Sequence, residues 1–528
     1  MSKEKSESLF LLIKSLSKSE KRYFKLFVSQ QDSKATDKKF VRLFDVIDGM
    51  EVYDETRISV HAPELKASQL PNQKAHLYKR ILQALRQYER GKLTDIDIRE
   101  MIDYAELLFN RSLYDQCVEV LKKARRKAEQ HDNLELLLEI YKWEKIVLSM
   151  TLSKNNEDRV NKIVKGVETT NNRINNINRF TNLTVKLNSL YLKMGYVKNR
   201  KDHEAVSKLF HDEMVPYDER RLSFTEKLNL YVLYVGYYFF IQDVDKAYMY
   251  AYKLVNMFDE KDLLMLPRLD MYIRGLNSLM IAQYKLNKYR EFVETRNKLK
   301  RLNKLPSSLL NDNIRIKLFK YSYVHEFNRL FMLGNFKEGV ERFERIEPHI
   351  DFFVEKLDKH SRMILFYKIA CLYVGDSNYR GAVYWLNRII NTEYVENDMR
   401  EDIHSFARIL SLICHYELEN IDVMEYLVRS TYRFLYKKGN LYLVHLYILH
   451  FLKKLNKEMT PKELMHEFVK LREQLLPLED DPYERRPFIY FDIISWLQSK
   501  ISGQPVEEII QAKAKKRIGK DYPVLRQG

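Results

Sequence analysis

One short pattern returns eight times along this chain, at intervals of 42 to 47 residues. Each copy starts at an anchor residue and continues with a small or apolar residue three positions later and apolar residues seven and ten positions later. A period of this size is typical of stacked supersecondary units that bury their apolar faces only against their neighbours. The repeat therefore predicts an array of helical units. The anchors are Tyr114, Glu157, Asp202, Val244, Tyr289, Phe336, Tyr379 and Ile421.

The residues that follow the anchors define the face that each unit buries. Three positions after the anchors stand Cys117, Val160, Ala205, Ala247, Phe292, Gly339, Ala382 and Met424. Seven positions after them stand Leu121, Val164, Leu209, Ala251, Arg296, Phe343, Leu386 and Val428. Arg296 is the one polar exception in this second series, so the fifth unit departs from the pattern at that point.

Glycine and proline are scarce, with 14 and 12 copies among 528 residues. Average proteins contain roughly 7% and 5% of these residues, so long helices joined by short loops are expected. A hydrophobic content of 45% and a charged content of 31% are typical of an ordered protein. The composition predicts an all-α chain that is too long for one core and forms several domains or an array.

The chain carries 90 Lys and Arg against 73 Asp and Glu, a net charge of +17. This excess permits an acidic partner, although a solvated helical surface explains it as well. Cys117, Cys371 and Cys414 lie far apart without a CxxC pair, which fits a reducing cytoplasm and indicates no zinc site or disulfide framework. The first residues lack the pattern of a signal peptide, and the longest apolar run, residues 231–241, is too short for a membrane span. We therefore expect a cytoplasmic protein.

Residues 1–92 are predicted to form an N-terminal helical domain outside the repeat register. Ser17 and Glu20 have the spacing of a capping box, so a helix should begin near Lys18. Apolar residues at helical spacing predict further helices over residues 38–50 and 74–88, and Thr94 or Asp95 is expected to cap the next helix.

Residues 93–440 form the predicted array, and its clearest units lie at residues 326–346 and 365–390. In each, an apolar helix ends at a glycine, Gly334 or Gly375, and a second helix follows from the anchor. Gly339 and Ala382 stand where the paired helices would approach most closely, because small residues allow close axes.

These two units resemble tetratricopeptide repeats. The matching residues are Leu330, Phe336, Gly339, Phe343 and Ile346 in one unit and Ala370, Tyr373, Tyr379, Ala382, Leu386 and Ile389 in the other. The spacing here exceeds the 34 residues of that family, so longer helices are expected, and the pattern is degenerate over residues 150–215. The resemblance implies an α-solenoid of about eight long tetratricopeptide-like hairpins.

Residues 441–528 are predicted to be C-terminal capping helices followed by a basic tail at 513–520. Thr460, Pro461 and Glu463 form a helix start that combines an N-cap, a first-turn proline and a capping-box acid. LSKSEKRYFKLF near the start, taken with WLQSKISG near the end, also resembles a group of large bacterial cytoplasmic proteins of no assigned activity.

No phosphate-binding, dinucleotide-binding, metalloprotease or nucleophile-elbow motif occurs in the sequence. The thirteen histidines are scattered and none has the spacing of a metal ligand pair. We therefore expect a non-catalytic protein without a metal or cofactor.

In tetratricopeptide repeats the first helix of each pair forms the ligand-facing surface, and the resemblance implies a partner-binding site on these helices. Asn328 occupies a position that often binds peptide backbone, whereas Val324 stands where a carboxylate clamp would require a lysine. The resemblance thus implies a scaffold that holds a protein or peptide partner in a concave groove, without a clamp for C-terminal carboxylates. The implied residues are Arg274, Asn277, Tyr284, Tyr321, Asn328 and Tyr367.

The alternative hypothesis is a nucleic-acid-binding or transcription-regulatory protein. Helices at 38–50, 54–61 and 74–88 would then form a helix-turn-helix variant, and basic clusters at helix ends would contact phosphates. The reading helix would present Lys74, His76, Lys79 and Arg80. The basic clusters are residues 122–127 and 296–304, with Arg433, Lys437 and Lys438; cations at these places also stabilise helix C-termini without any ligand.

Overall fold

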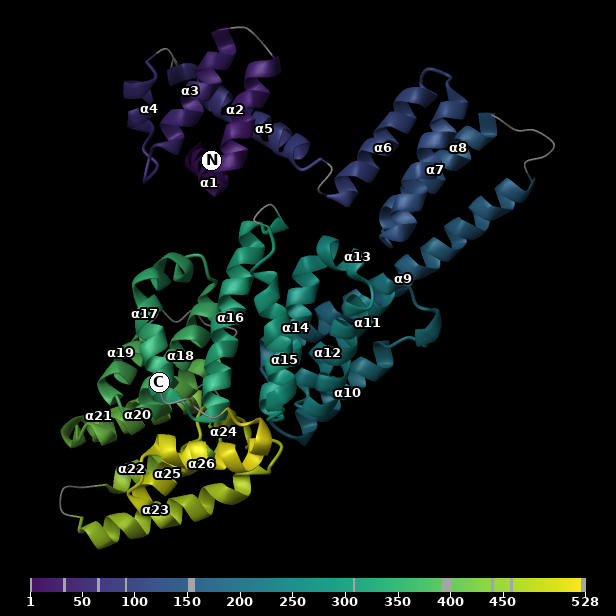
Figure 1. Cartoon of the computed structure of the whole chain (residues 1–528). Helices are drawn as coiled ribbons and strands as arrows, with labels where there is room; N and C mark the ends of the chain where they lie inside the picture. Colours follow the sequence, from purple (N-terminus) through teal and green to yellow (C-terminus); the bar gives the residue numbers. More distant parts are fainter. Residues whose placement is uncertain are drawn as a thin grey trace. The chain divides into compact units, whose positions relative to one another are not determined.

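The computed structural model describes residues 2–31, 35–63, 67–90, 93–150, 157–306, 309–391, 401–437, 441–455 and 459–523. All regular structure in these ranges is helical, as the sequence predicts, and consecutive helices pack side by side as in a helical repeat array (Figure 1). The chain divides into two compact units, Met1–Ile174 and Asn175–Gly528. Among the described helices, none has both the length and the apolar character needed to cross a membrane.

The first unit begins with a small helical bundle that buries its own apolar core. The predicted capping box is confirmed: the Ser17 amide donates to Glu20 at 2.7 Å and the Glu20 amide donates to the Ser17 hydroxyl at 3.2 Å. The predicted helices at 38–50 and 74–88 are also present, with starts three or four residues earlier. The elements are α1 (Ser2–Ser15), α2 (Lys18–Gln31), α3 (Ala35–Asp48), α4 (Glu55–His61), η1 (Ala67–Gln69) and α5 (Leu70–Tyr88).

Four further helices follow this bundle in the described residues: α6 (Thr94–Phe109), α7 (Tyr114–Gln130), α8 (Leu134–Met150) and α9 (Glu157–Met194). The predicted cap at Thr94 or Asp95 is wrong, because Leu93 is the N-cap residue and makes no side-chain cap bond. Thr94 is instead the first residue of the helix.

The described residues of the second unit form five helix pairs whose members are joined by turns of two or three residues. The pairs are α11 (Phe224–Phe240) with α12 (Val244–Asp259), α14 (Leu269–Lys285) with α15 (Tyr289–Leu302), α16 (Asp312–Leu333) with α17 (Phe336–Val354), α18 (Lys359–Gly375) with α19 (Tyr379–Ile390), and α20 (Glu401–Glu417) with α21 (Ile421–Lys437). Before and between the first two pairs lie α10 (Arg200–Glu213), η2 (Glu219–Arg221), α13 (Asp262–Met265) and η3 (Leu266–Arg268).

The turns inside these pairs, and the turn between α6 and α7, share one backbone conformation. In each, the residue two positions before the anchor has a positive φ, and the amide of the next residue donates to the carbonyl five positions earlier. This left-handed turn satisfies the last carbonyls of the first helix and starts the second helix at the anchor. The left-handed residues are Ser112, Gln242, Asn287, Gly334, Ser377 and Glu419.

Seven of the eight anchors are the first residue of a helix, and the exception is Asp202, the third residue of α10. The expected pattern is wrong in the second and third repeats, which start at the anchors Glu157 and Asp202. The 38-residue helix α9 occupies most of the second repeat, and Val164 of the second repeat and Ala205 of the third are exposed where buried residues were expected. The region that is degenerate in sequence therefore lacks regular pairs.

Arg296 breaks the apolar series because its guanidinium pairs with Glu326 of the following helix, α16. Glu326 also accepts from Arg329 and Arg342, at 3.0 Å each. Burial raises the pKa of Glu326, but the charges of Arg329 and Arg296 outweigh burial and hold this pKa below its usual value. The carboxylate therefore joins α15, α16 and α17 through a shared ion-pair network.

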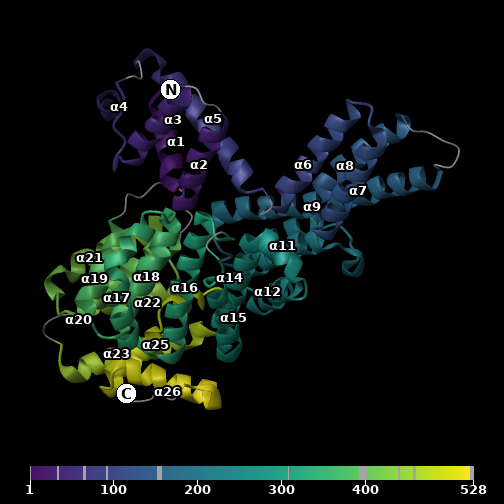
Figure 2. The same cartoon turned by 45° about the horizontal axis from the view of Figure 1, so that its top comes forward.

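The C-terminal part of the second unit packs against the helix pairs of the same unit (Figures 1 and 2). The predicted capping box of Thr460 and Glu463 is confirmed at the start of α23. The elements are α22 (Leu443–Lys454), α23 (Pro461–Leu475), η5 (Leu476–Glu479), α24 (Arg486–Tyr490), α25 (Ile493–Ser502), α26 (Val506–Ile518) and η6 (Gly519–Asp521).

The segment 513–520, expected to be a basic tail, lies instead in α26 and η6. Helix α26 packs on the turn between α16 and α17. The Glu507 carboxylate accepts from the amides of Phe336 and Lys337 at 2.9 and 3.3 Å, and Arg517 donates to the Met332 carbonyl at 2.9 Å. A Cβ on Gly334 would lie 2.8 Å from the α26 backbone, so this turn requires glycine both for its φ of 76° and for space.

Candidate ligand-binding cavity

The first helices of the pairs in the second unit surround a cavity of about 390 Å³, called here the inner cavity. Helix α14 contributes Asn277, Ile281 and Tyr284, which share one face because they are four and three residues apart. Helices α16 and α18 contribute similar stripes, and α11 and α20 contribute Phe239 and Ile403. The first helix of each pair therefore lines the cavity, in the way that the resemblance implies.

Five of the six residues that the resemblance implied for partner binding line the inner cavity. They are Asn277, Tyr284, Tyr321, Asn328 and Tyr367. Arg274 lies outside the lining and its guanidinium pairs with Asp270 at 3.1 Å. Val324, at the place of the missing clamp lysine, also lines the cavity.

A chain of polar contacts joins three helices at the wall of the inner cavity. Lys368 of α18 donates to the side-chain oxygen Oδ1 of Asn328 at 2.6 Å, and the side-chain nitrogen Nδ2 of Asn328 lies 3.3 Å from His325 Nδ1. His325 Nε2 lies 3.0 Å from the side-chain oxygen Oδ1 of Asn277 on α14. Since Asn328 accepts from Lys368 through its oxygen, its nitrogen donates to His325, and His325 in turn donates to Asn277.

This network requires a neutral His325. Complete burial, followed by the charge of Lys368, lowers the pKa of His325 to about 3. A neutral ring with one donor and one acceptor matches its two neighbours, so the network positions the side chains of Asn277 and Asn328. Asn328 is itself buried, and its amide links His325 to Lys368.

Among the described residues that line the inner cavity, four carry cationic side chains, Lys285, Lys320, Lys368 and Arg486, and none is an aspartate or glutamate. Arg486 pairs with Asp402 at 2.6 Å, and Lys320 donates to the Ser361 hydroxyl at 2.5 Å.

Aromatic rings surround these charges. The Lys368 ammonium lies 5.2 Å from the centre of the Phe331 ring and 5.5 Å from that of Tyr284. The Arg486 guanidinium lies 3.6 Å from the centre of the Tyr196 ring. Rings hold cations in place through their electron-rich faces while they offer apolar contact to a ligand. The inner cavity thus combines positive charge with flat apolar walls.

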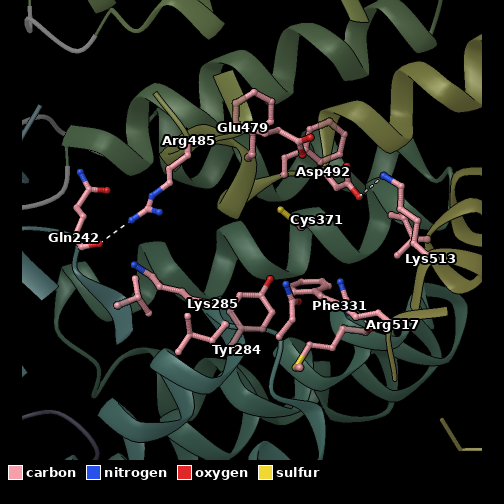
Figure 3. A pocket seen from close by; sticks show the side chains of 18 of the residues that line it. Gln242, Tyr284, Lys285, Phe331, Cys371, Glu479, Arg485, Asp492, Lys513 and Arg517 are labelled. Carbon is pink, nitrogen blue, oxygen red and sulfur yellow. Dashed lines mark hydrogen bonds and ion pairs between the residues drawn. The ribbon is translucent and has the colours of Figure 1, made fainter. Parts of the chain in front are cut away.

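A second cavity of about 640 Å³, called here the end cavity, adjoins the inner cavity. The two share Gln242, Tyr284, Lys285, Phe331 and Cys371 in their linings. Figure 3 shows Tyr284 and Cys371 in this lining, with side chains of the C-terminal segment opposite the turns of the helix pairs.

Arg485 fastens the C-terminal segment across the end cavity by donating to the Gln242 carbonyl at 2.8 Å (Figure 3). Lys513 pairs with Asp492 at 3.5 Å. The lining of this cavity carries four acids, Asp243, Asp245, Glu479 and Asp492, and four cations, Lys285, Arg485, Lys513 and Arg517. Acids and cations are therefore equal in number among the described residues of this lining.

The groups that could act as nucleophiles here are held in their protonated forms. Burial raises the pKa of the Cys371 thiol to about 12 and raises the pKa of the Tyr284 hydroxyl as well. Within the described ranges no group of three or more His, Cys, Asp or Glu residues is placed to hold a metal ion. The arrangement is suited to binding.

Lysine 368 was not among the residues expected at the site. It stands four residues after Ile364 on the same stripe of α18, so helical spacing from a lining residue was the available signal. Lys285, Lys320 and Arg486 were also missed, and Arg486 comes from a distant part of the chain.

The structure also places the residues of the nucleic-acid alternative. Lys74, expected on a reading helix, is buried and donates to the Tyr53 hydroxyl at 2.6 Å while it pairs with Glu55 at 2.9 Å. The His76 ring stacks on Phe40, whereas Lys79 is exposed and Arg80 is half-buried. Lys74 is therefore not presented to a groove of DNA.

Several cations of the basic helix ends pair with neighbouring acids. Arg125 pairs with Glu144 at 3.1 Å and Lys127 with Asp97 at 2.6 Å, while Lys298 pairs with Asp259 at 2.5 Å. Arg433 and Lys437 are exposed on α21, and Lys438 lies outside the described residues. Arg125, Lys127 and Lys298 therefore join their helices to neighbouring ones.

Comparisons of the chain with protein-family models, with curated proteins and with solved structures find no match.

Proposed function

We propose that this chain is a non-catalytic cytoplasmic scaffold, an α-solenoid of tetratricopeptide-like hairpins that holds a segment of another protein in the groove formed by the inner and end cavities. The observation that carries the proposal is the convergence of Asn277, Tyr284, Tyr321, Asn328 and Tyr367 on one cavity. Amide and phenol groups set among apolar walls suit the recognition of a peptide, whose backbone offers both donors and acceptors.

The dimensions of the groove favour an extended segment. Packed helices lie 8–10 Å apart, so the stripes on α14, α16 and α18 span roughly 20 Å. An extended chain advances about 3.3 Å per residue, so about six residues cross these three helices. The continuity of the inner and end cavities through Tyr284, Phe331 and Cys371 extends the path beyond a single small pocket.

Site-specific photo-crosslinking in the native cell tests the proposal. A benzophenone amino acid replaces Ile281, which lines the inner cavity, and in a matched control it replaces Tyr252, which is exposed on α12 and lines neither cavity. The expected result is an adduct at position 281 that maps to one short segment of another protein. The same segment should be absent at position 252.

The synthetic segment identified in this way should then bind the full chain in a fluorescence anisotropy titration. A Tyr321→Ala variant should bind it more weakly by about tenfold or more, because an aromatic contact in a buried site contributes more than 1 kcal/mol. Equal adducts at both positions, or binding unchanged by Tyr321→Ala, would refute the proposed groove.

A further inference from the structure

Helix α26 is fastened to the turn between α16 and α17 through main-chain groups. Glu507 accepts from the first amides of α17, where a helix carries partial positive charge. Arg517 donates to the Met332 carbonyl at the end of α16, where a helix carries partial negative charge. Tyr522 and Gln511 donate to the carbonyls of the next two residues, at 3.2 and 3.3 Å. These contacts serve main-chain groups at helix ends, where intrahelical partners are missing.

The apolar contacts of α26 are fewer than those of the helix before it. Helix α26 buries Val506, Ile509 and Ala514, whereas the shorter helix α25 buries five residues, with Trp496 among them. A helix with few buried apolar side chains opens at a lower cost than the core around it. Polar contacts add less to this cost, because water takes the place of each partner when they break. Helix α26 is therefore held less firmly than α25.

The connection between α25 and α26 has the properties of a hinge. Residues 502–505 are exposed, and Gly503 has a φ of 74°. A Cβ on Gly503 would meet no atom within 4 Å, so the backbone has free space there. The Gln504 carbonyl accepts from the hydroxyl of Ser499, which belongs to α25, at 2.6 Å. Rotation about this connection would therefore move α26 and leave α25 in place.

The end cavity lies between the C-terminal segment and the turns of the helix pairs (Figure 3). Helix α26 contributes Val506, Ile510, Lys513 and Arg517 to its lining. The C-terminal segment is fastened twice to the turns, by Arg485 at Gln242 and by α26 at the α16–α17 turn. A loop in the middle of a longer chain has no free end to thread between these two fastenings. One of them must open for such a loop to enter.

We propose that α26 is a hinged gate, which swings about Gly503 to admit a segment of the partner protein and then closes over it. This inference rests on the proposed function and specifies how the partner segment enters the groove. The contacts of Glu507, Gln511, Arg517 and Tyr522 keep the gate closed. When they break, α26 loses its support, and opening also unfolds it, because a 13-residue helix is marginal in water on its own.

Hydrogen–deuterium exchange of the full chain without any ligand tests whether α26 opens alone. After correction for intrinsic rates, the amides of α26 should exchange faster than those of α25 by about tenfold or more. Glu507→Ala should speed exchange in α26 by about tenfold, the change expected for the loss of one charge-assisted hydrogen bond, and leave α25 unchanged. Glu508→Ala, the matched control, changes an exposed acid on the same helix and should leave exchange in α26 unchanged.

A reversible lock provides an independent measurement. In the variant Lys337→Cys/Glu508→Cys, two exposed positions beside the Glu507 contacts are joined by a bismaleimide linker that contains a disulfide. Linking should slow exchange in α26 by about tenfold or more, and reductant should restore it. The matched control, Lys337→Cys/Glu341→Cys, links two exposed positions within α17 and should leave exchange in α26 unchanged.

Stopped-flow association of the partner segment identified by crosslinking then tests the role of the gate in entry. The chain locked between positions 337 and 508 should bind the partner segment more slowly by about tenfold or more, and reductant should restore the rate. The chain linked within α17 should bind it at the wild-type rate.

The outcomes separate the two proposals. Equal exchange in α26 and α25, exchange that Glu507→Ala does not speed, or association that the lock does not slow would each overturn the inference and leave the groove function standing. Equal adducts at positions 281 and 252 would overturn the groove function and, with it, the role of α26 in entry.

Discussion

Alanine substitution at Gly339 tests how closely the helix pairs are packed. A Cβ at this position of α17 would lie 2.6 Å from Leu372 Cδ2 of α18 and 3.3 Å from Leu330 Cδ1 of α16. Both leucines are fully buried, so neither side chain has room to withdraw. Gly→Ala in a helix gains up to about 1 kcal/mol of stability, and an extra methyl group in a filled core costs about 1–3 kcal/mol. The net change should be a loss of up to about 2 kcal/mol.

Gly236 of α11 provides the matched control, because a Cβ there meets no atom within 4 Å. Gly236→Ala should therefore raise the free energy of unfolding by about 1 kcal/mol through helix propensity alone. The unfolding free energies of the two variants should differ by about 1–3 kcal/mol although their chemical change is identical.

Urea denaturation followed by tryptophan fluorescence measures this difference. A Trp143→Phe background limits the signal to Trp385 and Trp496, since the chain has three tryptophans. Both remaining tryptophans are buried in the unit that contains the two glycines. If Gly339→Ala and Gly236→Ala raised the urea midpoint equally, the close approach of α17 and α18 would be refuted.

Three other results are expected from the same unit. Glu326→Gln should lower the free energy of unfolding by about 3 kcal/mol at pH 7, because removing one member of a buried ion-pair network leaves the others uncompensated. Since the Arg charges lower the pKa of Glu326, the difference in unfolding free energy between wild type and variant should shrink as the pH falls below 4.5. Because the pKa of His325 is lowered to about 3, the unfolded state alone binds its proton between about pH 6.5 and 3. As the pH is lowered through that window, the free energy of unfolding of the wild type should therefore fall by up to about 1.4 kcal/mol per pH unit. The urea midpoint of His325→Gln should depend less steeply on pH. Glu419→Gly should stabilise the α20–α21 turn by roughly 0.5–1 kcal/mol in the same assay, because Glu419 adopts a φ of 57° that glycine adopts without strain; a lower urea midpoint would contradict this explanation of the turn.

The periodic part of the fold was predictable because it depends on local chemistry. The anchors mark helix starts, and the turn before each begins the next helix through short-range hydrogen bonds. Among the six turns that share this conformation, the left-handed residue is a glycine in one, at Gly334, so glycine did not mark the other five in the sequence. The pattern failed around Val164 and Ala205, where residues at the right spacing lie on the exposed side of a helix.

The candidate site was predictable only in part, because it depends on residues far apart in the chain. The helical stripe that contains Tyr321 and Asn328 follows from spacing, and the resemblance supplied the side of the helix that lines the inner cavity. By contrast, Glu507 reaches the amide of Phe336 across 171 residues, and Arg486 reaches Asp402 across 84. Such contacts leave no periodic trace, so the closure of the end cavity by the C-terminal segment came from the structure alone.

Hydrogen–deuterium exchange of the full chain, with and without the segment identified by crosslinking, tests the central claim most directly. If the first helices of the pairs form the binding surface, saturating segment should slow exchange in peptides from α14, α16 and α18 around Asn277, Asn328 and Tyr367. Peptides from α19 and α21, which contribute no residue to the lining of either cavity, should be unchanged. Protection confined to those second helices, with none in α14, α16 or α18, would contradict a groove lined by the first helices.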